Sequence, residues 1–145
     1  MNEYLIAEKK VKKICFVTTI SGTMRSFVVG VASYLHQQAG YDITMICDDD
    51  AAFAASLPPY MHYIPIPMKR GVSLGGIGAM MKMVKVFRRE RFDMVQYSTP
   101  NASLYAALAA KLAGVPVRLY CQWGMAYVGF HGIKRVIFKR IEKLV

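Results

Sequence analysis

Residues 13–23 carry the clearest structural pattern in the sequence, KICFVTTISGT. Residues 13–20 form a nearly continuous apolar and β-branched run, as a strand covered on both faces requires. A Ser-Gly-Thr turn then interrupts the run, and residues 24–38 have the pattern of a helix that Gly40 ends. A buried strand that leads directly into a helix is typical of a parallel sheet in an α/β protein.

Strand and helix patterns alternate along the rest of the chain. Further strands are predicted at residues 42–47, 61–65, 92–97 and 115–121, and further helices at residues 48–56, 76–91, 101–113 and from residue 131 to the end. Thr99 and Pro100 suit the capping and first positions of a helix, and Gly114 suits its end. We therefore predict the α/β class, with residues 1–145 forming a single Rossmann-like, three-layer α/β/α domain around an open parallel sheet.

Composition agrees with one folded domain that has an anionic partner. A chain of 145 residues with 54% hydrophobic residues can bury a full core. The formal net charge is +10, and the basic excess lies mainly in residues 68–91 and 130–145. Such a balance favours lipid head groups, nucleic acid or phosphorylated substrates as partners.

The cysteines and an aspartate triplet both have structural interpretations. Cys15, Cys47 and Cys121 lie in apolar, strand-like runs without metal-ligand spacing, so we expect inert core thiols in a reducing compartment. The Asp48-Asp49-Asp50 triplet follows a strand and precedes a helix. We interpret it as a helix cap with a solvated face rather than a Mg²⁺ or Mn²⁺ site, and we predict no metal.

Three loops are the candidate ligand-binding segments, because ligands bind beyond the carboxyl ends of the strands in an open parallel sheet. The loop at residues 18–25 can bind an anion through backbone N–H groups at a helix start, or form a simple tight turn. The loops at residues 96–101 and 121–127 carry amide, hydroxyl and aromatic side chains, which suit sugar hydroxyls. Trp123 has an equal alternative as an ordinary core aromatic. The sequence lacks G-x-G-x-x-G, the P-loop motif and any Ser-His-Asp set, so we expect no bound cofactor.

The last predicted helix is both basic and amphipathic. Its apolar face consists of Ile133, Val136, Ile137, Ile141 and Leu144. The basic residues around that face are Lys134, Arg135, Lys139, Arg140 and Lys143. The pattern favours binding to an anionic membrane surface, with a core-packed helix that has a solvated basic face as the equal alternative. We expect no secretory signal and no membrane-spanning helix, and the pattern stops at Val145 without a helix-ending residue, so we expect a truncated sequence.

Taken in order, three segments resemble the N-terminal domain of family 4 retaining glycosyltransferases that build capsular, O-antigen and exopolysaccharides. They are KKICFVTTISGTMRSFVVGVASYL, PIPMKRGVSLGGIGAMMKMVKVFRRERFDMVQYSTPNASLYAALAAKLAGVPV and QWGMAYVGFHGIKRVIFKRIEKLV, within residues 11–145. The resemblance implies one half of a GT-B fold, with the active site between two Rossmann-like domains. This half would hold the acceptor, often a polyprenyl-diphosphate-linked saccharide, at the inner face of the cell membrane. A C-terminal domain absent from this chain would bind the nucleotide-sugar, a co-substrate, and transfer would retain configuration without a metal.

The same resemblance implies roles for individual residues. The family loop that approaches the donor diphosphate matches Ser21, Gly22 and Thr23. The predicted acceptor-binding residues are Arg25, Tyr97, Ser98, Thr99, Asn101, Gln122, Trp123, Gly124 and Tyr127. Where many members carry a histidine near the end of the fourth strand and His-Gly or Arg-Gly after the fifth, this chain has Gln96 and Trp123, which become the catalytic candidates. These departures favour positioning and electrostatic help over a protein general base.

Two other functions remain open at this point. One is a small Rossmann-type sugar-nucleotide epimerase or reductase, against which the missing glycine fingerprint and the missing Tyr-x-x-x-Lys pair argue. The other is a non-catalytic basic module for membrane or nucleic acid, which the placement of the aromatic residues disfavours. We expect a glycosyltransferase half that is inactive alone, cytoplasmic and peripheral on the membrane, with no nucleic-acid partner.

Overall fold

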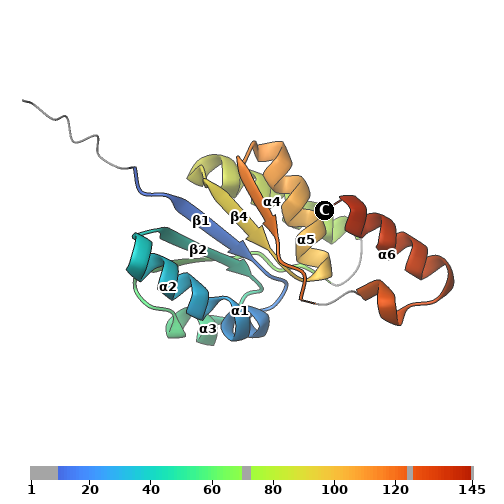
Figure 1. Ribbon diagram of the computed structural model, residues 1–145, viewed down its shortest axis with the longest axis horizontal. Coiled ribbons are helices and arrows are strands. Elements are labelled where there is room, and N and C mark those ends of the chain that lie inside the picture. The colour runs from blue at the N-terminus through green and yellow to red at the C-terminus, as the bar shows by residue number, and fades with distance from the viewer. Residues whose placement is uncertain (1–9, 70–72, 124–125, 145) are drawn as a thin grey trace, which may run out of the picture.

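A computed structural model of the chain describes residues 10–69, 73–123 and 126–144, and gives only the backbone of residues 126 and 127. Five parallel strands form one sheet in the order β3-β2-β1-β4-β5. The strands are β1 Lys13–Val17, β2 Asp42–Cys47, β3 Met61–Pro65, β4 Met94–Tyr97 and β5 Val117–Tyr120. Helices flank the sheet (Figure 1), so the predicted Rossmann-like α/β fold with an open parallel sheet is confirmed.

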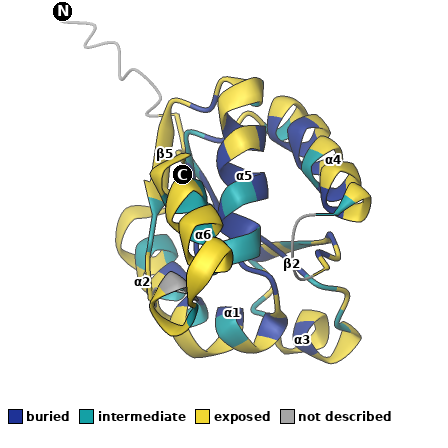
Figure 2. Ribbon diagram, turned by 90° about the vertical axis from the view of Figure 1, so that its right-hand side faces the viewer, coloured by how far each residue is buried: buried dark blue, intermediate teal, exposed yellow. Residues whose placement is uncertain are grey.

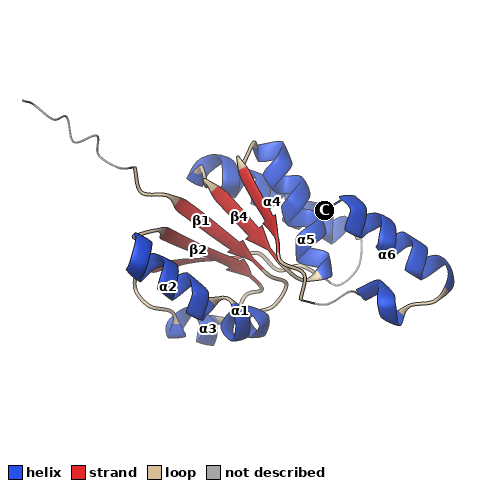
Figure 3. Ribbon diagram, viewed as in Figure 1, coloured by secondary structure: helices blue, strands red, loops and turns tan. Residues whose placement is uncertain are grey.

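The helices are α1 Ser21–Phe27, α2 Val29–Ala39, α3 Ala51–Ser56, α4 Leu74–Glu90, α5 Pro100–Ala113 and α6 Gly132–Leu144, with a short 3-10 helix, η1, at Ala126–Gly129. Helices α1, α2 and α3 cover one face of the sheet and α4 and α5 the other, whereas α6 lies outside α5 (Figure 3). Alternate residues of β1 point to opposite faces. Cys15 and Val17 therefore enter the core beneath α4 and α5, whereas Ile14 and Phe16 enter the core beneath α1, α2 and α3.

Several predicted boundaries differ from the structure. The predicted helix at residues 24–38 comprises two consecutive helices that meet at Val28, where φ is −112° and ψ is −44°. The backbone N–H groups of Val28 and Ala32 still donate to the carbonyls four residues earlier, and Met24, Val28 and Ala32 enter one core. The first, fourth and fifth strands are shorter than predicted and the first ends at Val17, whereas the strands at residues 42–47 and 61–65 have the predicted bounds.

The last strand and the last helix are the least enclosed elements. β5 pairs with β4 alone and forms an edge of the sheet, with Val117 51% exposed and Leu119 43% exposed. Along the described residues of α6 no side chain is buried, and Figure 2 shows this helix largely exposed on the outside of the molecule. None of the described helices combines the length and the apolar character that crossing a bilayer demands.

Candidate functional site

The candidate site lies at the carboxyl ends of β1 and β4, where the strand order changes direction. The chain leaves β1 toward β2 on one side, while β4 lies on the other side, and such switch points are where α/β sheets bind ligands. Two threonines meet there. The hydroxyls of Thr19 and Thr99 lie 2.7 Å apart, and the backbone N–H of Thr19 donates to Thr99 Oγ1 over 3.2 Å.

Thr99 has an unusual backbone. It occupies the N-cap position of α5 with Pro100 next, as predicted, but its φ is +76° and its side chain makes no capping hydrogen bond. The expected capping bond is absent because the hydroxyl reaches across the switch point to Thr19 instead. A non-glycine residue in this region costs about 1–3 kcal/mol, and such outliers gather at functional sites. The strain supports the β1–β4 edge as the functional edge of the sheet.

The start of α1 is held by two carboxylates. Asp48 Oδ1 accepts a hydrogen bond of 2.6 Å from the backbone N–H of Ser21, and Asp50 Oδ2 accepts one of 2.7 Å from the Ser21 hydroxyl. Asp50 also accepts from the backbone N–H of Phe53 over 2.9 Å, so it caps α3 as the sequence predicted. The N–H of Phe53, followed by the hydroxyl of Ser21, lowers the pKa of Asp50 below its usual range.

This network bears on the predicted donor-phosphate loop. Both donors of Ser21 are engaged by carboxylates, while Gly22 is exposed and Thr23 is partly buried beside it. A phosphate bound at the start of α1 would lie close to the carboxylates of Asp48 and Asp50, which carry the same sign of charge. Diphosphate binding by Ser21, Gly22 and Thr23 stays a prediction, with Asp48 as the group it must displace or avoid.

The predicted acceptor-binding residues separate into buried and accessible groups. Tyr97 is 2% exposed and stacks on Tyr120 with 5.9 Å between ring centroids, and Ser98 is 1% exposed. Gln96 lies within β4 and is partly buried, as is Asn101 in the first turn of α5. Arg25 is exposed, with its guanidinium carbon 5.5 Å from the centroid of the Phe53 ring.

Trp123 is not a core residue. It is 43% exposed and stacks on Phe27 of α1, with ring centroids 4.9 Å apart and an angle of 29° between the planes. The alternative of an ordinary core aromatic is therefore wrong. Sequence reasoning missed Phe27, since it lies within a helix far from residue 123 in the chain. Gly124 and the side chain of Tyr127 lie outside the described residues.

Gln122 connects this loop to α6. Its side-chain N–H donates to Glu142 Oε2 over 3.4 Å, and the Tyr120 hydroxyl donates to the same oxygen over 2.9 Å. Burial, followed by the hydrogen bond to Glu142, raises the pKa of Tyr120, so this hydroxyl stays protonated. Sequence reasoning also missed Glu142 as a member of the site. The available signal was that Glu142 is the one acidic residue among residues 126–144.

The thiols fit a structural role. Cys15 and Cys47 are buried, and burial raises the pKa of Cys15 well above its usual value and that of Cys47 to about 12. Both thiols therefore stay protonated and unreactive. Cys121 differs from the expectation, because it follows the edge strand and is only partly buried.

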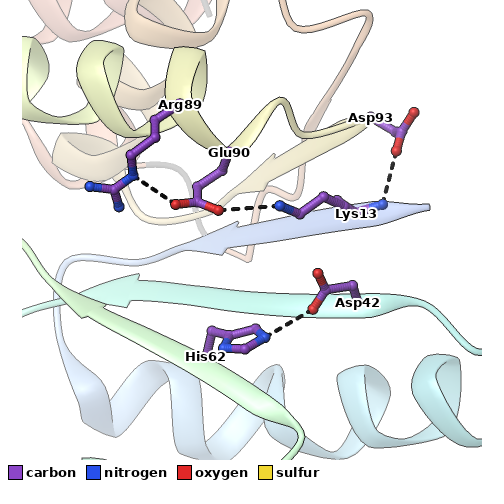
Figure 4. Close-up of polar contacts among 6 residues, drawn as sticks. All are labelled: Lys13, Asp42, His62, Arg89, Glu90 and Asp93. Carbon is purple, nitrogen blue, oxygen red and sulfur yellow. Dashed lines mark hydrogen bonds and ion pairs between the residues drawn. The ribbon is translucent and has the colours of Figure 1, made fainter. Parts of the chain in front are cut away.

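A set of polar contacts lies at the amino ends of the strands, away from the candidate site (Figure 4). Lys13 Nζ contacts Glu90 at 3.2 Å, and the backbone N–H of Lys13 donates to Asp93 over 2.9 Å. His62 Nε2 lies 3.2 Å from Asp42. These residues lie at or near the amino ends of the strands, so they anchor the sheet and take no part in the candidate site. Within the described part of the chain, no cluster of three His, Cys, Asp or Glu side chains is placed to hold a metal ion.

The exposed surface of α6 carries both charge and apolar area. All five basic residues, Lys134, Arg135, Lys139, Arg140 and Lys143, are exposed. Ile133 is 79% exposed, Val136 53% and Leu144 72%. Over the described residues α6 therefore packs on the rest of the domain along one side only, and binding to a membrane surface stays a prediction. An almost wholly apolar cleft of about 190 Å³ separates α6 from α5, lined by Pro100, Asn101, Leu104, Tyr105, Ile137, Phe138 and Ile141.

Comparisons with known proteins show which protein family the chain resembles. Residues 13–145 match the family described as Glycosyl transferase 4-like. The capsular polysaccharide biosynthesis glycosyltransferase CapM of Staphylococcus aureus is 27% identical over 138 residues, which are 93% of this chain and 35% of that protein. The Escherichia coli UDP-Gal:alpha-D-GlcNAc-diphosphoundecaprenol alpha-1,3-galactosyltransferase is 24% identical over 136 residues, 92% of this chain and 34% of that protein. The chain thus spans about a third of the length of these relatives.

Solved structures show the same fold. MurG of Acinetobacter baumannii superposes with a TM-score of 0.59 at 18% identity, covering 90% of this chain and 39% of that one. The S. aureus MnaA-UDP co-structure gives a TM-score of 0.63 at 16% identity, covering 93% of this chain and 36% of that one. At these identities the likeness establishes the Rossmann-like arrangement alone.

Proposed function

The chain belongs to the glycosyl transferase 4-like family, and from that membership we propose that it forms the acceptor-side, N-terminal domain of a GT-B glycosyltransferase of cell-surface polysaccharide synthesis. The match over residues 13–145 is the observation that carries the proposal. It favours a transferase over a sugar-nucleotide epimerase or reductase and over a basic non-catalytic module. The greater length of the relatives supports a further, donor-binding domain as the partner of this one.

The proposed reaction moves a sugar from a nucleotide-sugar to a membrane-linked saccharide. The E. coli relative is named for such a transfer, from UDP-Gal to a diphosphoundecaprenol-linked acceptor. In this chain Trp123 would stack on the apolar face of an acceptor sugar, and Gln122 and Asn101 would bind its hydroxyls. Gln96 is the further catalytic candidate. Retention of configuration without a metal would rely on positioning and electrostatic stabilisation rather than on a protein general base.

Acceptor binding by this chain tests the proposal. The probe is a GlcNAc-diphosphate carrying a short prenyl tail, with binding measured by calorimetry. Loss of a stacking contact worth about 0.5–1.5 kcal/mol predicts that Trp123→Ala weakens binding by about twofold to tenfold. Tyr34→Ala, at a 64% exposed aromatic on α2, is the control and should bind normally. Tighter binding of UDP-galactose than of the acceptor, unaffected by Trp123→Ala, would assign this chain to the donor side instead.

We further propose that α6 attaches the protein to the inner face of the cell membrane. Its exposed apolar residues would enter the head-group region, and its five basic residues would meet anionic lipids. A Lys or Arg near an anionic surface contributes about 1 kcal/mol, so the double change Lys139→Ala with Arg140→Ala should weaken vesicle binding by roughly thirtyfold.

Sedimentation with vesicles of phosphatidylcholine and phosphatidylglycerol in equal parts measures this loss. The matched control is Lys82→Ala with Lys85→Ala, which removes the same charge from exposed positions of α4. Equal weakening by the two double variants would show that total charge, rather than α6, drives the binding.

A further inference from the structure

Helix α6 contacts the rest of the molecule along a narrow stripe. Its partly buried residues are Phe138, Ile141 and Glu142, whose spacing of three and four places them on one side of the helix. Phe138 and Ile141 line the cleft against α5, and Phe138 also stacks on Phe130 at 4.9 Å. Two of the three contacts in the stripe are therefore apolar and non-directional, and they do not by themselves fix the helix.

Glu142 supplies the directional contact. Its Oε2 accepts hydrogen bonds from Tyr120, the last residue of β5, and from Gln122, directly before Trp123. Lys139, Arg140 and Lys143 lie within three residues of Glu142 in the sequence, yet the hydrogen bonds described for Glu142 go to neutral side chains of the sheet edge. Hydrogen bonds to a carboxylate are stronger than those between neutral groups, so the 2.9 Å bond from Tyr120 is the main contact, and the 3.4 Å bond from Gln122 is a weaker second one.

We propose that Glu142 is a positioning residue that couples the basic surface helix to the loop at residues 121–123. The coupling makes α6 and the loop move together, so that docking of α6 on an anionic surface also orders Gln122 and Trp123. The consequence for acceptor binding rests on the proposed function. The coupling itself rests only on the contacts of Glu142.

Trp123 is the single tryptophan of the chain, so its fluorescence reports on this loop without labelling. In solution, Glu142→Ala should increase quenching of Trp123 by acrylamide, because the loop loses its tie to α6. Glu142→Gln keeps a carbonyl acceptor and should fall between wild type and Glu142→Ala. Arg140→Ala, an exposed change on the same helix, should match wild type. Equal quenching in all four proteins, with circular dichroism showing unchanged helix content, would overturn the proposal.

Vesicles of phosphatidylcholine and phosphatidylglycerol in equal parts test the coupling during docking. Wild type should sediment with the vesicles and show a shift in Trp123 emission. Glu142→Ala should still sediment, since it removes a negative charge, but should lose the emission shift. The same shift in both proteins would overturn the coupling. If wild type does not sediment, surface attachment by α6 is wrong, and the acrylamide comparison alone decides whether Glu142 holds the loop.

Discussion

The centre of the molecule and its β5–α6 end are held in different ways. β1 pairs with a strand on each side, and residues 14–17 are at most 5% exposed. β5 pairs on one side only, and both Val117 and Leu119 are about half exposed. The helices repeat the difference. Buried side chains run along α4 and α5, whereas α6 is partly buried at most over its described residues (Figure 2).

The difference teaches that strand burial depends on neighbours as much as on the strand itself. Both strands contain apolar residues, and both were predicted from the same kind of pattern. Helices α1 to α5 form the layers on the two faces of the sheet around β1. In contrast, β5 has α5 on one face and an unpaired edge. Weakly enclosed elements open at low free-energy cost, which suits a surface helix and its attached loop.

The largest expected difference in the free energy of unfolding is between two large-to-small substitutions, one in β1 and one in β5. Phe16→Ala removes a 1% exposed ring from β1 and should lower the free energy of unfolding by about 3–5 kcal/mol. Leu119→Ala removes a half-exposed side chain from β5 and should lower it by less than about 1 kcal/mol. Urea unfolding of both variants measures the difference. Similar losses would mean that β5 is as enclosed as β1 in solution, and the contrast would disappear.

The fold could be predicted because its signals are local. Residues 42–47 and 61–65 were placed with the observed bounds, since Pro58-Pro59 and the aspartate triplet separate them cleanly. The division of the first helical segment at Val28 was not predicted, because residues 24–38 carry one continuous helical pattern without a proline. Thr18 and Thr19 look strand-like in sequence, but tertiary contacts turn them into the loop that meets Thr99.

The candidate site could be predicted as a region and less well as a set of side chains. The carboxyl ends of parallel strands share one edge, so the three loops had to lie along it. Which side chains face outward depends on register and packing. Tyr97 therefore turned inward while Trp123 turned outward. Phe27 of α1 and Glu142 of α6 also lie at the site, where they contact Trp123 and Tyr120. No sequence pattern within either helix indicates these contacts.

A smaller contrast lies between two glycines of α4. An added Cβ at Gly76 would lie 2.0 Å from the Tyr105 hydroxyl of α5, and Tyr105 is only 3% exposed. Gly76→Ala should therefore cost about 1–3 kcal/mol through overpacking. Gly78 has nothing within 4 Å of an added Cβ, so Gly78→Ala should instead stabilise by up to about 1 kcal/mol through helix propensity.

If α4 and α5 pack closely at Gly76, thermal unfolding should show a lower Tm than wild type for Gly76→Ala and a higher Tm for Gly78→Ala. The α5–α6 contact, with its open cleft, has no equivalent close approach among the described glycines. A stabilising Gly76→Ala would show that the helices of the centre are packed as loosely as α6, and would remove the distinction between the two regions.

The smallest expected effect is on how the free energy of unfolding depends on pH in acid, through Asp93. The backbone N–H of Lys13 holds the pKa of Asp93 below its usual value, and the charge of Lys12 adds to this. Because the folded pKa is lowered, the stabilisation is complete above the unfolded pKa of about 3.9 and is lost as pH falls through the lower folded value. This partly exposed pair should contribute less than about 1 kcal/mol.

Asp93→Asn can keep the hydrogen bond to Lys13 but no longer titrates. Its urea midpoint should therefore lie slightly below that of wild type near neutral pH, and the two midpoints should converge below pH 4 as wild type loses the charged carboxylate. Ser26→Ala, an exposed change in α1 that removes no titratable group, should keep the wild-type slope. Since Asp93 joins β1 to the start of β4, its titration should loosen the centre of the sheet. Acid quenching of Trp123 that precedes global unfolding in Asp93→Asn and wild type alike would place the first acid-sensitive step at the β5–α6 end instead.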